Sequence, residues 1–261
     1  MTGTALLESL LRRDRAVVIG GLVAITGLAW VYLFVTAAGM GDMSAAIGGM
    51  AKAAIAPWSA LDFALMFVMW AVMMVAMMVP SAAPMILLYA AVVRKQQDKG
   101  HAFAPVSVFA AGYVVVWSAF SLGATALQWA FEQAALVSPM MVATSPLLGG
   151  VLLIAAGVYQ WTPLKHACLK HCRSPLQFLS HGFRKGAGGA LRMGLEHGAF
   201  CVGCCWVLMG LLFVGGVMNL LWIAGIAAFV LIEKLAPFGR HTGRVTGVAL
   251  ALWGIYVVVQ S

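Results

Sequence analysis

Residues 193–209 read MGLEHGAFCVGCCWVLM and begin a stretch that carries no Asp, Glu, Lys or Arg from residue 197 to residue 232. A long uncharged stretch of this kind is typical of membrane-spanning helices. On a helix, four side chains at spacings i, i+4, i+7 and i+8 share one face: His197, Cys201, Cys204 and Cys205. Thiols and an imidazole at hydrocarbon depth are costly for a purely structural helix. The stretch therefore predicts a membrane helix bundle arranged around a soft metal ion.

The composition of the whole chain also indicates a membrane protein. Of its 261 residues, 63% are hydrophobic and only 9% are charged, and the mean hydropathy is +0.97. Soluble domains carry about 25% charged residues, so a water-soluble fold is excluded. The net charge of +8 would favour nucleic acid in a soluble chain. In a membrane protein, basic residues instead gather in the cytoplasmic loops.

The uncharged runs predict an all-α, polytopic transmembrane bundle of about seven helices, with residues 1–261 as a single integral membrane domain. The predicted helices cover residues 16–39, 63–93, 105–131, 147–162, 194–214, 217–235 and 242–260. With a cytoplasmic N-terminus, every Lys and Arg except Lys52 lies on the cytoplasmic side. This asymmetry follows the positive-inside rule and explains the net charge without nucleic acid.

The segments between these helices are predicted to be loops or polar connections, at residues 41–57, 94–101, 132–146 and 162–192. Pro80 and Pro84 lie inside the second helix, where each removes a backbone donor. That helix is therefore expected to be kinked or locally unwound.

Several other residues are explained by helix ends and helix packing. Four charged residues are interpreted as interfacial markers of helix ends: Asp62, Glu132, Glu233 and Lys234. Gly194 and Gly198 form a small-residue pair that would let another helix approach closely.

A second cysteine motif, KHACLKHCRSP, lies in the polar stretch at residues 165–175. Cys168 and Cys172 are spaced i, i+4, and His171 is next to the second thiol. Thiols in a cytoplasmic loop stay reduced, so a metal site is favoured over a disulfide. Four thiolates would satisfy a tetrahedral Zn site, and two or three suit Cu(I). The alternative is that these cysteines are ordinary small core residues.

The second helix is rich in methionine, and Met77 and Met78 lie just before Pro80. Thioethers are soft ligands suited to Cu(I), although methionine also fills gaps in apolar cores. A rise of about 1.5 Å per residue from the nearest basic residue puts these methionines and residues 201–205 near mid-membrane. The 165–175 motif can join them only if its loop folds back into the bundle.

The role of His197 has two readings, a metal ligand or a histidine near the headgroups at the start of a helix. Haem is not expected, because the other histidines lie in predicted loops and a second deep histidine is missing. No Ser/His/Asp set, phosphate-binding loop or pair of catalytic carboxylates is found. Whether the chain is an enzyme stays open.

Three motifs stand out together: MWAVMMVAMMVPSAAP at 69–84, KHACLKHCRSP at 165–175, and a segment from His197 to Trp222 that contains HGAFCVGCCWVLM and GVMNLLW. They resemble the bacterial family of predicted metal-binding integral membrane proteins, a domain of unknown function numbered 2182. The resemblance implies metal binding at four residues: Cys168, Cys172, Cys201 and Cys204. Cys205, His171 and His197 belong to the surrounding pattern.

The sequence and this resemblance favour a multi-pass protein of the bacterial inner membrane that binds Cu(I), with Zn as the alternative metal. Such a protein would transport the ion or deliver it to a membrane or metallochaperone partner. Such a protein would be embedded in the lipid bilayer, and nucleic acid is not expected as a partner. The sequence is compatible with an oligomer. Two other functions stay open. A CxxC motif in a membrane helix is also found in oxidoreductases that use thiols or a metal, and short loops are also typical of a structural subunit of a membrane complex.

Overall fold

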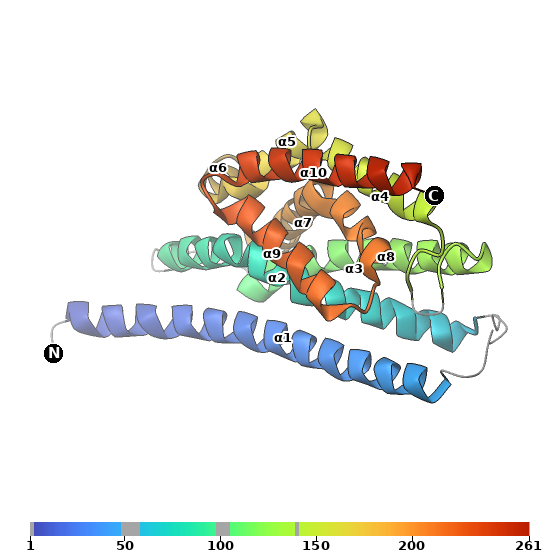
Figure 1. Ribbon diagram of the computed structural model, residues 1–261. Helices are drawn as coiled ribbons and strands as arrows, with labels where there is room; N and C mark the ends of the chain where they lie inside the picture. Colours follow the sequence, from blue (N-terminus) through green and yellow to red (C-terminus); the bar gives the residue numbers. More distant parts are fainter. Residues whose placement is uncertain (1–2, 48–57, 98–104, 139–140, 261) are drawn as a thin grey trace.

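The computed structural model describes residues 3–47, 58–97, 105–138 and 141–260 (Figure 1). Within these residues the regular structure is helical, apart from an isolated antiparallel bridge between Val137 and Ala143. The helices are α1 (Gly3–Ile47), α2 (Ala60–Gln97), α3 (Val106–Gln133), α4 (Pro146–Tyr159), α5 (Pro163–Arg173), α6 (Pro175–Gly182), α7 (Gly186–Gly210), α8 (Leu212–Gly215), α9 (Leu220–Leu235) and α10 (Gly239–Val259). The all-α prediction is confirmed for the described residues.

Among the described helices, five segments are long and apolar enough to cross a membrane: Arg15–Gly39, Ala60–Lys95, Val106–Gln133, Gly186–Gly215 and Gly239–Val259. α4 and α5 form a sixth candidate, with a bend of 64° between them. α9 has 16 residues, fewer than the roughly 20 that a straight span needs. These helices are compatible with a multi-pass membrane protein, and the count of seven spans stays a prediction.

Several segments predicted as loops are helical instead. α1 continues to Ile47 and α2 to Gln97, beyond their predicted ends at residues 39 and 93. The polar stretch 162–192 folds into α5, α6 and the first part of α7. Alanine, methionine, lysine, arginine and glutamine are good helix formers, so helices extend past the apolar segment. The end of an apolar run therefore does not mark the end of a helix here.

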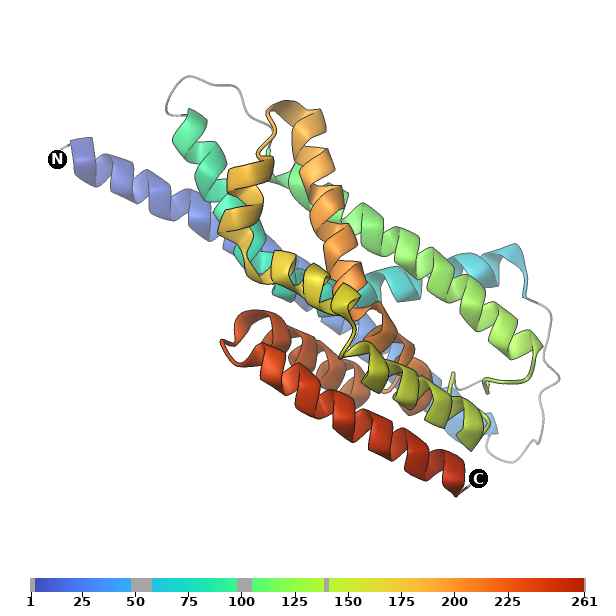
Figure 2. The same ribbon diagram turned by 90° about the horizontal axis from the view of Figure 1, so that it is seen from above.

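α2 passes through Pro80 and Pro84 as one continuous helix, so of the two predicted outcomes, a kink or local unwinding, the unwinding does not occur. Its axis changes direction along its length (Figure 2, cyan to blue-green), as proline rings cause. Two hydroxyl groups donate to the carbonyl oxygen of Met78: Ser81 Oγ at 2.8 Å and, from α3, Tyr113 OH at 3.0 Å. Hydroxyl groups and packed neighbours of this kind satisfy the backbone around a proline in a membrane helix.

α7 lies between α3 and the α5–α6 segment (Figure 2). Glycines bring the backbones of α3 and α7 together. A Cβ at Gly194 would overlap the Phe109 carbonyl oxygen, and a Cβ at Gly112 would lie 2.5 Å from the Leu191 carbonyl oxygen. The predicted close approach of another helix at Gly194 and Gly198 is therefore made by α3. This contact fixes the rotation of α7 about its axis and so decides which face points into the bundle.

A buried ion pair joins α5 to α9. Lys165 Nζ lies 2.8 Å from the Glu233 carboxylate, and the two side chains are 1% and 2% exposed. Arg173, the last residue of α5, donates to the carbonyl oxygens of Glu233 and Ala236 at 2.7 Å each. The interfacial interpretation of Glu233 is wrong, because the end of α9 packs against α5. These contacts fold the second cysteine motif back into the bundle.

Candidate metal centre

One face of α7 carries the buried sulfur atoms. Cys201, Cys204 and Cys205 are at most 1% exposed, and His197 is 3% exposed. The helical spacing predicted that these four side chains share a face, and burial agrees with it. The outward side of the same helix is lined by exposed residues such as Trp206. α7 therefore points its thiols and its imidazole into the bundle rather than toward the surface.

α5 brings the second cysteine motif to this face. Cys172 Sγ lies 4.0 Å from Cys204 Sγ, and Cys168 is buried. Gly203 makes the approach possible, because a Cβ at this position would lie 2.7 Å from Cys168 Sγ. Tyr159, at the end of α4, donates from its hydroxyl to the Gly203 carbonyl oxygen. The missing side chain at Gly203 thus sets the distance between α5 and α7.

α2 contributes a thioether. Met78 is fully buried, and its Sδ atom lies 3.9 Å from Cys205 Sγ. Met77 is 1% exposed, but it is Met78 that contacts the cysteine. Two sulfur–sulfur contacts of about 4 Å therefore join three helices. Cys205–Met78 joins α7 to α2, and Cys172–Cys204 joins α5 to α7.

Polar groups that the sequence interpretation missed surround Cys201. Lys234 Nζ, from the end of α9, lies 2.9 Å from Cys201 Sγ and 3.0 Å from Ser81 Oγ. Tyr113 OH lies 3.1 Å from the same sulfur. Lys234 is only 5% exposed, so its interpretation as an interfacial charge is wrong. An ionisable residue within an apolar helix is itself a signal of a functional site, and that signal was available in the sequence.

His197 lies in an aromatic surrounding next to the cysteines. Its ring centroid is 6.2 Å from Phe109, 5.7 Å from Tyr113 and 5.8 Å from Phe178. Its Nδ1 atom is buried without a hydrogen-bond partner among the described residues. A buried nitrogen without a partner is costly, and a metal ion would use it. His197 is therefore a suitable ligand by burial and chemistry.

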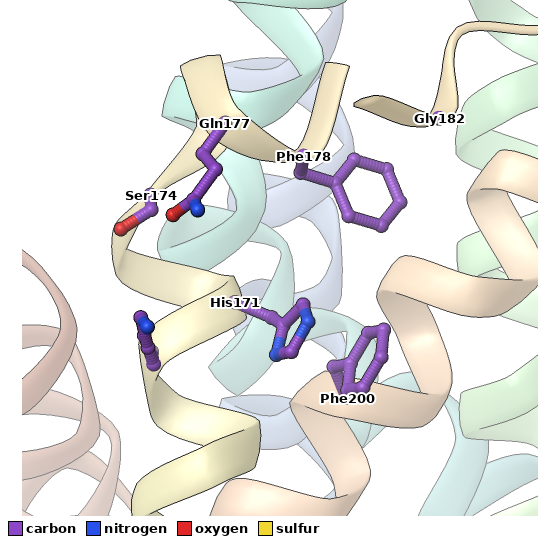
Figure 3. Close-up of a pocket in the computed structure, with 7 residues that line it drawn as sticks. His171, Ser174, Gln177, Phe178, Gly182 and Phe200 are labelled. Carbon is purple, nitrogen blue, oxygen red and sulfur yellow. The ribbon is translucent and has the colours of Figure 1, made fainter. Parts of the chain in front are cut away.

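His171 is not brought to the cysteines in the same way. Its Nδ1 donates to the Ala167 carbonyl oxygen at 2.9 Å, and its exposed ring stacks on Phe200 with centroids 4.0 Å apart. Figure 3 shows this stack at a pocket of about 350 Å³ whose wall also includes Gln177 and Phe178. His171 thus belongs to a pocket between α5, α6 and α7, although it is adjacent in sequence to Cys172.

Comparison with known families agrees with the chemistry of this sulfur cluster. Residues 67–257 match the PpoB2 family, which is described as a copper chaperone. The chain belongs to the PpoB2 copper chaperone family. The match begins within α2 and ends within α10. No curated protein and no solved structure matches the chain.

Membership of the PpoB2 family supports the metal-related family that the three motifs indicated, while the numbered domain of unknown function stays a resemblance. The matched region contains all five cysteines, Met78 and Lys234, and it leaves out α1. The copper-related role therefore belongs to the part of the chain that forms the cluster.

Two of the cysteines on α7 form hydrogen bonds to the backbone of their own helix. Cys204 and Cys205 each donate an S–H hydrogen bond to the Cys201 carbonyl oxygen, at 3.1 and 3.0 Å. In the described part of the chain, no three His, Cys, Asp or Glu side chains are arranged to hold a metal ion. Cysteine side chains have one rotatable bond to the sulfur atom and change rotamer readily on the scale of core motions. Binding an ion here requires the thiols to turn away from the Cys201 carbonyl oxygen.

Proposed function

We propose that the protein binds Cu(I) through the cysteines of α7 and α5 and passes the ion to a membrane or metallochaperone partner. The observation that carries this proposal is the approach of sulfur atoms from three helices, at Cys172–Cys204 and Cys205–Met78. Cu(I) prefers thiolate and thioether ligands in low coordination number. The copper chaperone family of the chain supports the same metal.

The proposed ligands differ in how directly the contacts support them. Cys201, Cys204, Cys205 and Cys172 form the central set, with Met78 as the thioether. Cu(I) needs only two or three ligands of this set, and Cys168 and His197 lie beside it as further candidates. Met77 and His171, which were also candidates, make no contact with the described cysteines that supports direct ligation.

Charge balance at Lys234 favours Cu(I) over Zn²⁺. Two thiolates around Cu(I) carry one net negative charge, which the Lys234 ammonium group cancels. Two thiolates around Zn²⁺ are neutral, so the same ammonium group leaves one net positive charge. A net charge is costly in a low-dielectric interior. Zn²⁺ would therefore need a third deprotonated thiol.

Binding would be coupled to proton release, because cysteine ligands must be deprotonated. The S–H groups of Cys204 and Cys205 that donate to the Cys201 carbonyl oxygen would lose their protons to the solvent or to an incoming carrier thiolate. Lys234 Nζ and Tyr113 OH remain in contact with Cys201 Sγ. Exchange between thiolates of the carrier, this cluster and the partner would then move the ion without a change of its oxidation state.

The membrane placement is part of the proposal. We propose one integral domain in the bacterial inner membrane with seven crossings and a cytoplasmic N-terminus. α1 begins at the end of the bundle where α2 ends, and α10 ends at the opposite end (Figure 1), which supports an odd number of crossings. α9 would be a short span and the α4–α5 pair a bent one. Lys52, the exception to the charge rule, lies outside the described residues.

Metal analysis of purified protein tests the copper proposal. The wild-type chain, expressed with added copper and extracted under reducing conditions, is expected to retain about one Cu(I) per chain. The double variant Cys201→Ser/Cys204→Ser is expected to retain little copper. Ala199→Ser, an exposed position on the same helix, is the matched control. Equal copper content in the double variant and the wild type would defeat the proposal.

A thiol oxidoreductase is a second candidate, favoured by the 4.0 Å between Cys172 Sγ and Cys204 Sγ. All five cysteines are free, and this pair could form a disulfide after a small movement. Thiol titration before and after a mild oxidant separates the two functions. A thiol count that does not fall on oxidation removes the redox candidate, and a loss of two thiols that Cys172→Ser prevents supports it.

A further inference from the structure

A groove runs between α1 and α2 and reaches the end of α9. Its volume is about 580 Å³. Its lining is apolar except at two arginines, and includes Arg15, Pro80, Pro84, Leu87, Arg94 and Leu235. The groove is separate from the sulfur cluster and includes a residue of α1, the helix that the family match leaves out.

Small and ring-shaped side chains on α2 create the hollow. Pro80, Ala83, Pro84 and Ala91 line it, and none of them fills the space that a long side chain would fill. From Pro80 to Arg94 the groove follows 14 residues of helix, or about 21 Å. One leaflet of the hydrocarbon core is about 15 Å thick. The groove is therefore long enough for an acyl chain that enters from one membrane surface.

The two arginines lie at the same end of this groove. Arg15 precedes the apolar part of α1 and Arg94 follows the apolar part of α2. Because both arginines line the same groove and lie at one end of the apolar segments of their helices, both are near the proposed cytoplasmic surface. Guanidinium groups bind phosphate oxygens with paired hydrogen bonds. Basic pockets between membrane helices on this side recognise anionic headgroups.

We propose that this groove binds one anionic phospholipid, with its phosphate at Arg15 and Arg94 and an acyl chain along α2 toward Pro80. The occupant is a lipid because the groove combines a cationic end with an apolar length. It is an anionic lipid because a zwitterionic headgroup brings its own cation to the two arginines. The bound lipid would bridge α1 and the helices of the region that matches the PpoB2 family, residues 67–257. The inference rests on the proposed membrane placement and is independent of copper.

Native mass spectrometry of the full chain tests the proposal. The detergent-solubilised protein is mixed with equal amounts of dioleoyl phosphatidylglycerol and dioleoyl phosphatidylcholine. The wild type is expected to retain one phosphatidylglycerol in preference to phosphatidylcholine. Arg15→Gln and Arg94→Gln are each expected to weaken phosphatidylglycerol binding about tenfold, because each removes a charged hydrogen bond. Arg192→Gln, an exposed arginine on α7, should leave the preference unchanged.

A second variant tests the acyl path without changing charge. Ala91→Trp fills the groove and is expected to weaken binding of both lipids about tenfold, whereas Ala111→Trp, an exposed position on α3, should not. Equal retention of the two lipids by the wild type, or a preference that survives both arginine substitutions, would overturn the proposal. So would a dimer mass without a lipid adduct, because a second copy would then cover the groove. Copper content, measured on the same samples, reports separately on the metal function.

Discussion

Lys234 Nζ lies 2.9 Å from Cys201 Sγ, with both residues at most 5% exposed. The ammonium group comes from α9 and the sulfur from α7. A buried ammonium group is stable only with a partner that carries or shares negative charge. The contact therefore links the charge of the cluster to a residue far away in sequence, and it gives the first prediction.

Replacing this ammonium group should change metal preference. Lys234→Met is expected to weaken Cu(I) binding by about 1–3 kcal/mol, or roughly fivefold to 150-fold in Kd, because the negative charge of the copper–dithiolate centre loses its partner. Zn²⁺ binding should weaken less or become tighter. Competition with chromophoric chelators measures both affinities, and Lys170→Met, exposed on α5, is the control. Equal loss for both metals would contradict the charge argument.

A methyl group at Gly203 should separate α5 from α7. A Cβ there would lie 2.7 Å from Cys168 Sγ, whereas a Cβ at Gly210 has nothing within 4 Å. Gly203→Ala is expected to destabilise the protein by about 1–3 kcal/mol and to lower copper retention. Gly210→Ala should change neither. Thermal unfolding in detergent and metal analysis measure the two effects, and equal behaviour of the variants would show that α5 does not need this approach.

The thioether of Met78 should matter more for copper than for folding. Met78→Leu keeps volume and is expected to cost less than about 1.5 kcal/mol of stability. Cu(I) affinity should fall about tenfold, because the sulfur atom 3.9 Å from Cys205 Sγ is lost. Met74→Leu, equally buried on the same helix, controls for packing. If both variants bind Cu(I) like the wild type, Met78 is a core residue and not a ligand.

Removing one partner of the ion pair between α5 and α9 should lower the free energy of unfolding more than removing both. Glu233→Gln leaves the Lys165 ammonium group buried without its carboxylate and is expected to cost about 3–5 kcal/mol. The double variant Glu233→Gln/Lys165→Met removes both charges and should recover most of that loss. Unfolding in detergent with denaturant measures the change. Additive losses in the double variant would argue against a direct pair.

Local periodicity predicted the part of the site that lies on one helix. The spacing of Cys201, Cys204 and Cys205 determines their common face whatever packs against it, and burial agrees. The close approach of another helix at Gly194 could be predicted for a similar reason, because a glycine on a helix surface leaves room for a neighbouring backbone whichever helix supplies it. Both predictions needed only the geometry of α7.

Contacts between distant segments could not be obtained in this way. Glu233 and Lys234 are adjacent charges at a helix end, a pattern that an interfacial pair would share. Their different partners, Lys165 and Cys201, are chosen by the tertiary fold. The packing of Cys172 against α7 depends on the same tertiary contacts. The sequence could therefore predict only that Cys172 joins the cluster if its segment folds back into the bundle.

The anchoring of α5 on α9 has a consequence for biosynthesis. Lys165 and Arg173 find their partners at Glu233 and Ala236, which the ribosome adds 60 to 68 residues later. Until then, the contacts that anchor α5 on α9 cannot form. The proposed copper site is therefore completed only after α9 has been made, and a nascent chain that stops before α9 would display its cysteines without this anchor to any oxidant or metal it meets.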